Sequence, residues 1–195
     1  ARAEKAGGSA RGSKGRPARM KVATFNINNV RRRLPNLLQW LDLVALGTIC
    51  DVVPLTGLNR ALVTQGLKVM GRRGNPGLVA LSDVARVTEA PSTYHAGFIL
   101  GPRVNAGGRV GEAAMGVRLL TCDDAETAQV LARQLDQFNR DRQMLEARVL
   151  EEAIDHAEAE KGAPVLLVAS DGWHAGVIGI VASRLAERYN RPACV

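Results

Sequence analysis

The sequence predicts an α/β protein in which a long helix connects two folded parts. Short apolar runs such as Leu43–Leu46 and Val165–Ser170, bounded by glycine, proline or polar residues, are typical of buried strands. Amphipathic helical patterns occur between these runs, and one of them continues from Asp123 to about Lys161. The chain has 195 residues, and 46% of them are hydrophobic, which is enough for one large domain or two small ones.

Residues 1–19 predict a disordered basic leader. They are mainly Ala, Gly, Ser, Lys and Arg, a composition that buries too little apolar surface to fold. Residues 1–33 hold ten Lys or Arg and one acid, so the net charge of +7 belongs to this arm and not to the rest of the chain. Two interpretations of the arm stay open, namely contact with nucleic acid or an anionic surface, and a solubilising tail.

The next elements are short. We expect a strand over 21–28, an amphipathic helix over 30–41, and a second strand over 43–46 that ends at Gly47. Further helices are predicted over 59–70, 78–85 and 113–120. The apolar residues 97–100 lead into 101–109, which the content of glycine and proline predicts to be a loop.

The long helix is predicted from its apolar stripe and its ends. Apolar residues recur at steps of three, four or seven, and Thr121–Asp124 supplies capping side chains at the start. Gly162 and Pro164 stop the helix, which at 1.5 Å per residue would be roughly 55 Å long. A strand over 165–170, a polar turn and a glycine-spaced helix follow.

The turn and helix from Gly172 to Leu185 form the strongest candidate site. Unpaired N–H groups in the first turn of a helix attract phosphate or carboxylate. His174 lies in the turn, Gly176 permits close approach, and Ser183 and Arg184 lie farther along the helix. A packed, hydrogen-bonded histidine is the alternative for His174, and for Trp173 we favour a core anchor over a base-stacking residue.

Two other segments carry candidate residues. Asp51 follows an apolar strand, where a carboxylate suits Mg²⁺ or Mn²⁺, although a capping aspartate is the more common case. Arg103, Asn105 and Arg109 lie among glycines, and guanidinium groups suit phosphate recognition. A solvated loop with surface arginines is the equally weighted alternative.

Cysteine usage and hydropathy predict a cytoplasmic protein. Cys50, Cys122 and Cys194 are scattered, odd in number and without metal-ligand spacing, which suits a reducing compartment. We find no signal peptide and no apolar run near the roughly 20 residues that span a bilayer. We therefore expect no membrane partner.

Four segments in order resemble the RecJ-type single-stranded-DNA exonucleases of the DHH phosphoesterase family. Asp42–Leu55 is similar to the last metal-site motif of the DHH domain, and Phe98–Arg109 to the linking loop that faces nucleic acid. Leu135–Gln143 resembles the connecting helix, and Gly172–Val195 the start of the DHH-associated, substrate-binding domain. The resemblance covers about residues 42–195.

The resemblance implies a domain order and residue roles. Residues 42–122 would be the C-terminal part of the DHH domain, 123–162 the connecting helix, and 163–195 the start of the DHH-associated domain. Asp51 would bind Mn²⁺ or Mg²⁺ in a two-metal phosphodiesterase centre. Arg103, Asn105 and Arg109 would grip the nucleic-acid backbone. The phosphate near the scissile site would be bound by His174, Gly176, Ser183 and Arg184.

The chain also departs from this pattern. No Asp-His-His triplet occurs anywhere in the sequence, and Asp51 alone cannot hold two cations. Residues 20–41 instead resemble the N-terminus of the exonuclease III family of apurinic-site endonucleases, with Asn26 matching an active-site asparagine. We therefore interpret the chain as a chimera with an internal fragment of a RecJ-type enzyme.

Three functions follow from these resemblances. The leading one is a fragment of a 5′-to-3′ single-stranded-DNA exonuclease of DNA repair and recombination, inactive by itself, with repair proteins as possible partners. The second is a module that binds single-stranded nucleic acid without catalysis. The third is a DHH-type phosphodiesterase for small nucleotides, which the long helix and the Arg103–Arg109 segment disfavour.

Overall fold

The computed structural model describes residues 30–159 and 162–195, with side chains from Trp40 onward. The predicted leader, the strand over 21–28 and Asn26 lie outside the described residues. The account below concerns the compact unit Leu34–Val195. Within the described residues, no helix is long and apolar enough to cross a bilayer.

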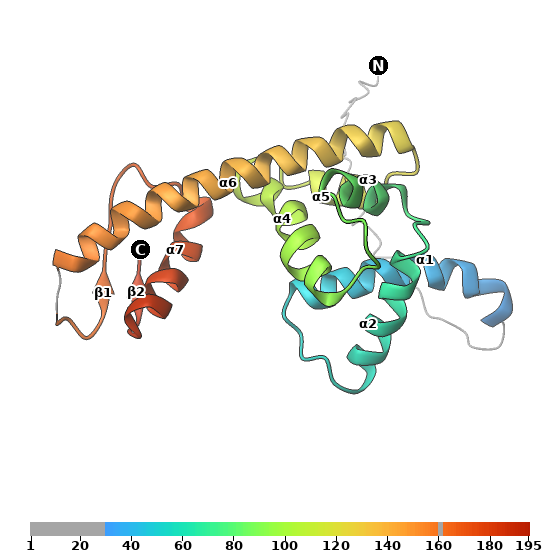
Figure 1. Cartoon of the computed structure of the whole chain (residues 1–195), viewed down its shortest axis with the longest axis horizontal. Helices are drawn as coiled ribbons and strands as arrows, with labels where there is room; N and C mark the ends of the chain where they lie inside the picture. The colour runs from blue at the N-terminus through green and yellow to red at the C-terminus, as the bar shows by residue number, and fades with distance from the viewer. Residues whose placement is uncertain (1–29, 160–161) are drawn as a thin grey trace, which may run out of the picture. The chain divides into compact units, whose positions relative to one another are not determined.

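The described chain is mostly helical and contains a small parallel sheet, which confirms the α/β class (Figure 1). The elements in chain order are α1 (Val30–Cys50), α2 (Gly57–Met70), α3 (Pro76–Val84), the π-helical η2 (His95–Leu100), α4 (Gly101–Val110), α5 (Met115–Leu120), α6 (Ala125–Ala159), β1 (Leu166–Leu167), α7 (Ala175–Tyr189) and β2 (Ala193–Cys194). The two strands pair in parallel, Leu166 with Ala193 and Leu167 with Cys194.

The long helix predicted from Asp123 to about Lys161 is confirmed as α6. Its N-terminal part packs against α3, α4 and α5, and its C-terminal part packs against α7 (Figure 1). Asp124 caps its start, since the Asp124 carboxylate accepts the N–H of Thr127 at 2.7 Å. A hydrogen bond from the Thr127 side chain, together with the one from its backbone N–H, lowers the pKa of Asp124 below its ordinary value.

Two apolar clusters lie along α6. The first contains the fully buried Leu81, Leu100, Leu119 and Leu135. The second gathers around α7 and β1 and contains Val149, Leu166, Val177, Val181 and Leu185. The helix therefore supplies one side of both cores, and the segment between them is where the polar groups of the site lie.

The strand predicted over 43–46 is wrong, because these residues are part of α1. Leu41, Ala45 and Leu46 are buried on one helical face. A short apolar run does not distinguish a buried strand from a buried helix by periodicity alone. The predicted end at Gly47 is also wrong, since α1 continues to Cys50. The proposed join at residues 41–42 therefore lies inside one continuous helix.

The loop predicted over 101–109 is wrong as well, because these residues form α4. Pro102 lies in the first turn, where the missing N–H of proline is tolerated. Gly101 and Gly107 serve packing instead of a turn. A Cβ on Gly101 would overlap Cys50, and one on Gly107 would lie 2.7 Å from the carbonyl oxygen of Glu112. The predicted helices over 59–70, 78–85 and 113–120 are confirmed as α2, α3 and α5, with ends shifted by a few residues.

Candidate nucleic-acid interface

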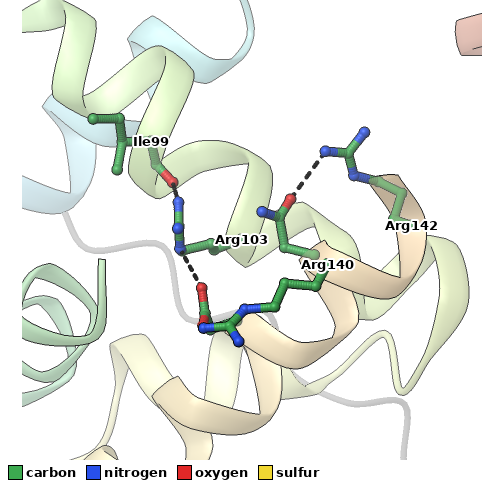
Figure 2. A network of polar contacts seen from close by, with 6 residues as sticks. Ile99, Arg103, Arg140 and Arg142 are labelled. Atoms are coloured by element: carbon green, nitrogen blue, oxygen red, sulfur yellow. Dashed lines mark hydrogen bonds and ion pairs between the residues drawn. The ribbon is translucent and has the colours of Figure 1, made fainter. Parts of the chain in front are cut away.

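Arg103 forms part of an internal polar network between α4 and α6 (Figure 2). Its Nε donates to the Asp136 carboxylate at 2.9 Å, and its Nη1 donates to the carbonyl oxygen of Ile99 at 2.6 Å. Arg140 donates to the other oxygen of Asp136 at 2.6 Å. The Asp136 side chain is only 6% exposed, so this network fixes α4 on α6. The predicted grip of Arg103 on nucleic acid stays a prediction, and the geometry assigns this residue an internal role.

Asn105 and Arg109 lie on the exposed face of α4. Arg109 Nη1 reaches the carbonyl oxygen of Gly176 at 3.3 Å, a long hydrogen bond from α4 to the start of α7. The other donors of a guanidinium group fan out in a fixed fork, so one weak bond leaves most of them for a ligand. Of the two predicted arginines on this segment, Arg109 is therefore the more exposed and the less engaged, and its binding to a phosphate stays a prediction.

His174 caps the first turn of α7. Its Nδ1 accepts the N–H of Gly176 at 3.0 Å, which satisfies one of the N–H groups predicted to face an anion. A Cβ on Gly176 would overlap the carbonyl oxygen of Arg109, so this glycine permits the close approach of α4 to α7. The alternative of a hydrogen-bonded histidine describes His174 best, and phosphate binding by His174 stays a prediction.

The expectation that Trp173 anchors the core is confirmed. Trp173 packs against the second apolar cluster and donates from Nε1 to Glu152 at 2.7 Å. Its indole thus has a hydrogen-bond partner on α6, as a partly buried tryptophan requires.

Ser183 and Arg184 lie exposed on α7. Ser183 Oγ donates to the carbonyl oxygen of Gly179 at 3.2 Å. The Arg184 guanidinium lies 3.7 Å from both Glu146 and Glu187, beyond hydrogen-bond distance in each case. With 56% of its side chain exposed, Arg184 is held only loosely.

Arg142 and Glu146 were not among the predicted site residues. Arg142 donates to Glu146 at 2.5 Å and to Asn139 Oδ1 at 3.0 Å, and both charged side chains are largely buried. Their spacing of four residues on α6 places them on one face, which is the signal that the sequence offered. Together with Arg109 and Arg184 they line a hollow of about 320 Å³ between α4, α6 and α7.

The predicted metal ligand Asp51 lies exposed in the turn after α1. Burial raises the pKa of the neighbouring Cys50 thiol, and the negative charge of Asp51 raises it further. Within the part of the chain that the structure describes, no three His, Cys, Asp or Glu side chains form a group that would hold a metal ion. The described residues therefore do not by themselves fit a two-metal centre.

Comparison with known proteins identifies the segment. No protein-family model matches the chain. The chain is 43% identical over 165 residues to the single-stranded-DNA-specific exonuclease RecJ of Dickeya dadantii, an alignment that covers 81% of this chain and 29% of the relative.

Solved structures of RecJ agree with this result. The structure of RecJ from Thermus thermophilus in complex with Mn²⁺ superimposes with a TM-score of 0.75 at 40% identity, over 84% of this chain and 24% of that protein. The structure in complex with Mg²⁺ gives a TM-score of 0.73 at 42% identity, over 84% of this chain and 26% of that protein. The chain thus spans under a third of these three proteins, and over about four fifths of its own length it is homologous to the RecJ exonucleases.

Proposed function

We propose that this chain forms the connecting and DNA-facing part of a RecJ-type single-stranded-DNA exonuclease, which hydrolyses phosphodiester bonds from 5′ to 3′ in DNA repair and recombination. The observation that carries the proposal is the hollow lined by Arg109, Arg142 and Arg184, in a segment 43% identical to a single-stranded-DNA-specific exonuclease. Its lining includes three arginines and one glutamate, a positive balance that suits a phosphodiester backbone. Cytoplasmic location and contacts with repair proteins remain predictions.

The described residues would bind and orient the strand. Arg109 and Arg184 come from different helices on either side of the hollow, which allows them to hold neighbouring phosphates in a fixed direction. A metal ion, Mn²⁺ or Mg²⁺ as in the Thermus thermophilus structures, would activate water when bound. Asp51 would be one ligand, and the described residues do not provide the others.

Because the described residues provide Asp51 as the one predicted metal ligand, a second function is also favoured. This function is single-stranded nucleic-acid binding without hydrolysis by the chain itself. The experiment is incubation of the purified chain with 5′-labelled single-stranded DNA and Mn²⁺, beside a binding titration in chelator. We expect binding that weakens steeply with salt, and no degradation. Mn²⁺-dependent degradation that disappears in Asp51→Asn would show that a complete metal site assembles, and absence of binding would refute both functions.

A further inference from the structure

The structure places an exposed aromatic pair beside the arginine-lined hollow. Tyr94 and Phe98 stack with ring centroids 5.5 Å apart and an interplanar angle of 28°. The Phe98 side chain is 75% exposed and lines the hollow together with Arg109 and Arg184. An exposed phenylalanine gains little from burial, so packing within the chain does not explain its position.

The segment from η2 through α4 presents these groups as one stripe. Phe98, Pro102, Asn105 and Arg109 follow one another at steps of four, three and four residues and all line the hollow. From Phe98 to Arg109 the rise is roughly 16 Å, which equals about four to five phosphate spacings of a stacked strand. An aromatic face therefore lies at one end of the stripe and a cation at the other.

We propose that Phe98, backed by Tyr94, stacks an unpaired base of single-stranded DNA while Arg109 and Arg184 bind phosphates of the same strand. This inference rests on the proposed function and adds to it the residues that recognise an unpaired base. Aromatic side chains stack bases of any sequence, because every base has a π-face. In a duplex those faces are covered by neighbouring base pairs, so the platform selects single strands.

The network around Glu146 keeps the hollow positive. Arg142 donates to Glu146 at hydrogen-bond distance, whereas Arg184 stays at 3.7 Å from the same carboxylate. The Glu146 charge is thus compensated from within α6, and Arg184 turns toward a phosphate without breaking a hydrogen bond to Glu146.

The test is a fluorescence-anisotropy titration of the full chain in chelator with a labelled oligothymidine of roughly 12 nucleotides. Phe98→Ala is expected to weaken binding at least about fivefold, the lower end for loss of one base stack. Phe98→Leu, which keeps apolar volume and loses the ring, is expected to weaken it similarly. Val117→Ala removes another exposed apolar side chain, on α5, where the residue is 66% exposed, and is expected to leave binding unchanged.

An abasic oligonucleotide of equal length separates stacking from other effects. Because it offers no base to Phe98, its affinity for the wild-type chain and for Phe98→Ala is expected to be equal. Equal weakening of both ligands by Phe98→Ala, or no weakening of either while the wild type binds, would overturn the inference and leave the proposed function standing. Failure of the wild-type chain to bind any single strand would instead remove the proposed function.

The proposed contact of Arg184 with a phosphate is tested separately, with Arg148 as the control residue. Arg184→Ala is expected to lower the salt dependence of binding by about 0.7 in the slope of log affinity against log salt, the value for one phosphate of a single strand. Arg148 is 61% exposed and lies 3.9 Å from Glu152, so it resembles Arg184 in exposure and in having only a long ion pair. Arg148→Ala is expected to keep the slope, and equal slopes for wild type and Arg184→Ala would contradict the assignment of Arg184.

Discussion

Two carboxylates on α6, Asp136 and Glu146, each lie beside two arginines but connect α6 to its neighbours differently. At Asp136 the arginine from another helix, Arg103, is hydrogen-bonded and largely buried. At Glu146 the arginine from another helix, Arg184, is exposed and lies beyond hydrogen-bond distance. Similar residues thus form a structural connection in one place and leave a cation for a ligand in the other.

The largest expected effect is the loss of stability when Arg103 is replaced. Arg103→Met removes the buried partner of Asp136 and leaves this carboxylate with the exposed Arg140, so we expect a loss of about 3 kcal/mol in the free energy of unfolding. Arg184→Met is expected to lose less than about 0.5 kcal/mol, because its ion pairs are exposed and long. Urea denaturation of both variants measures the difference.

The same two variants decide the nucleic-acid role. We expect Arg184→Met to weaken binding of single-stranded DNA and the folded fraction of Arg103→Met to bind as the wild type does. A stable Arg103→Met protein that no longer binds DNA would contradict the internal role, and it would support the grip on nucleic acid that the sequence predicted.

A smaller effect concerns the contact of α4 with α7. Gly176→Ala places a methyl group against the carbonyl oxygen of Arg109, and we expect a loss of about 1–3 kcal/mol in stability from overpacking. Gly179 on the same helix has open space around it, so Gly179→Ala is expected to be neutral or to stabilise by about 0.5–1 kcal/mol through helix propensity. Thermal unfolding followed by circular dichroism compares the two, and equal midpoints would refute the close approach.

The smallest effect lies at the start of α6. Because hydrogen bonds lower the pKa of Asp124 in the folded state, its charge stabilises the fold above the unfolded pKa, near 3.8, and this contribution is lost as the pH falls through the lower folded pKa. Asp124→Asn keeps a capping oxygen and removes the titration. We expect its stability to depend less on pH than that of the wild type in this acidic window, as measured by urea unfolding at a series of pH values.

Much of the local structure was predictable because it depends on local periodicity and capping. The stripe along 123–161, the cap at Asp124 and the stop at Gly162 and Pro164 predicted α6 to within two residues at either end. The strand at 43–46 and the loop at 101–109 were mispredicted for a shared reason. Glycine, proline and short apolar runs take their conformation from the packing around them, as Gly101 does against Cys50.

For the candidate site, too, some features were predictable from the sequence and others depend on tertiary contacts. The sequence by itself predicted Arg103, Arg109 and Arg184 as candidates for phosphate binding, since the chemistry of a guanidinium group does not depend on the fold. Only the tertiary structure decided which of them is available. Burial beside Asp136 occupies Arg103, while the distance between α6 and α7 leaves Arg184 exposed, and the stripe of η2 and α4 brings Phe98 to the same hollow. These outcomes depend on contacts between residues far apart in the chain, and such contacts cannot be predicted from local sequence.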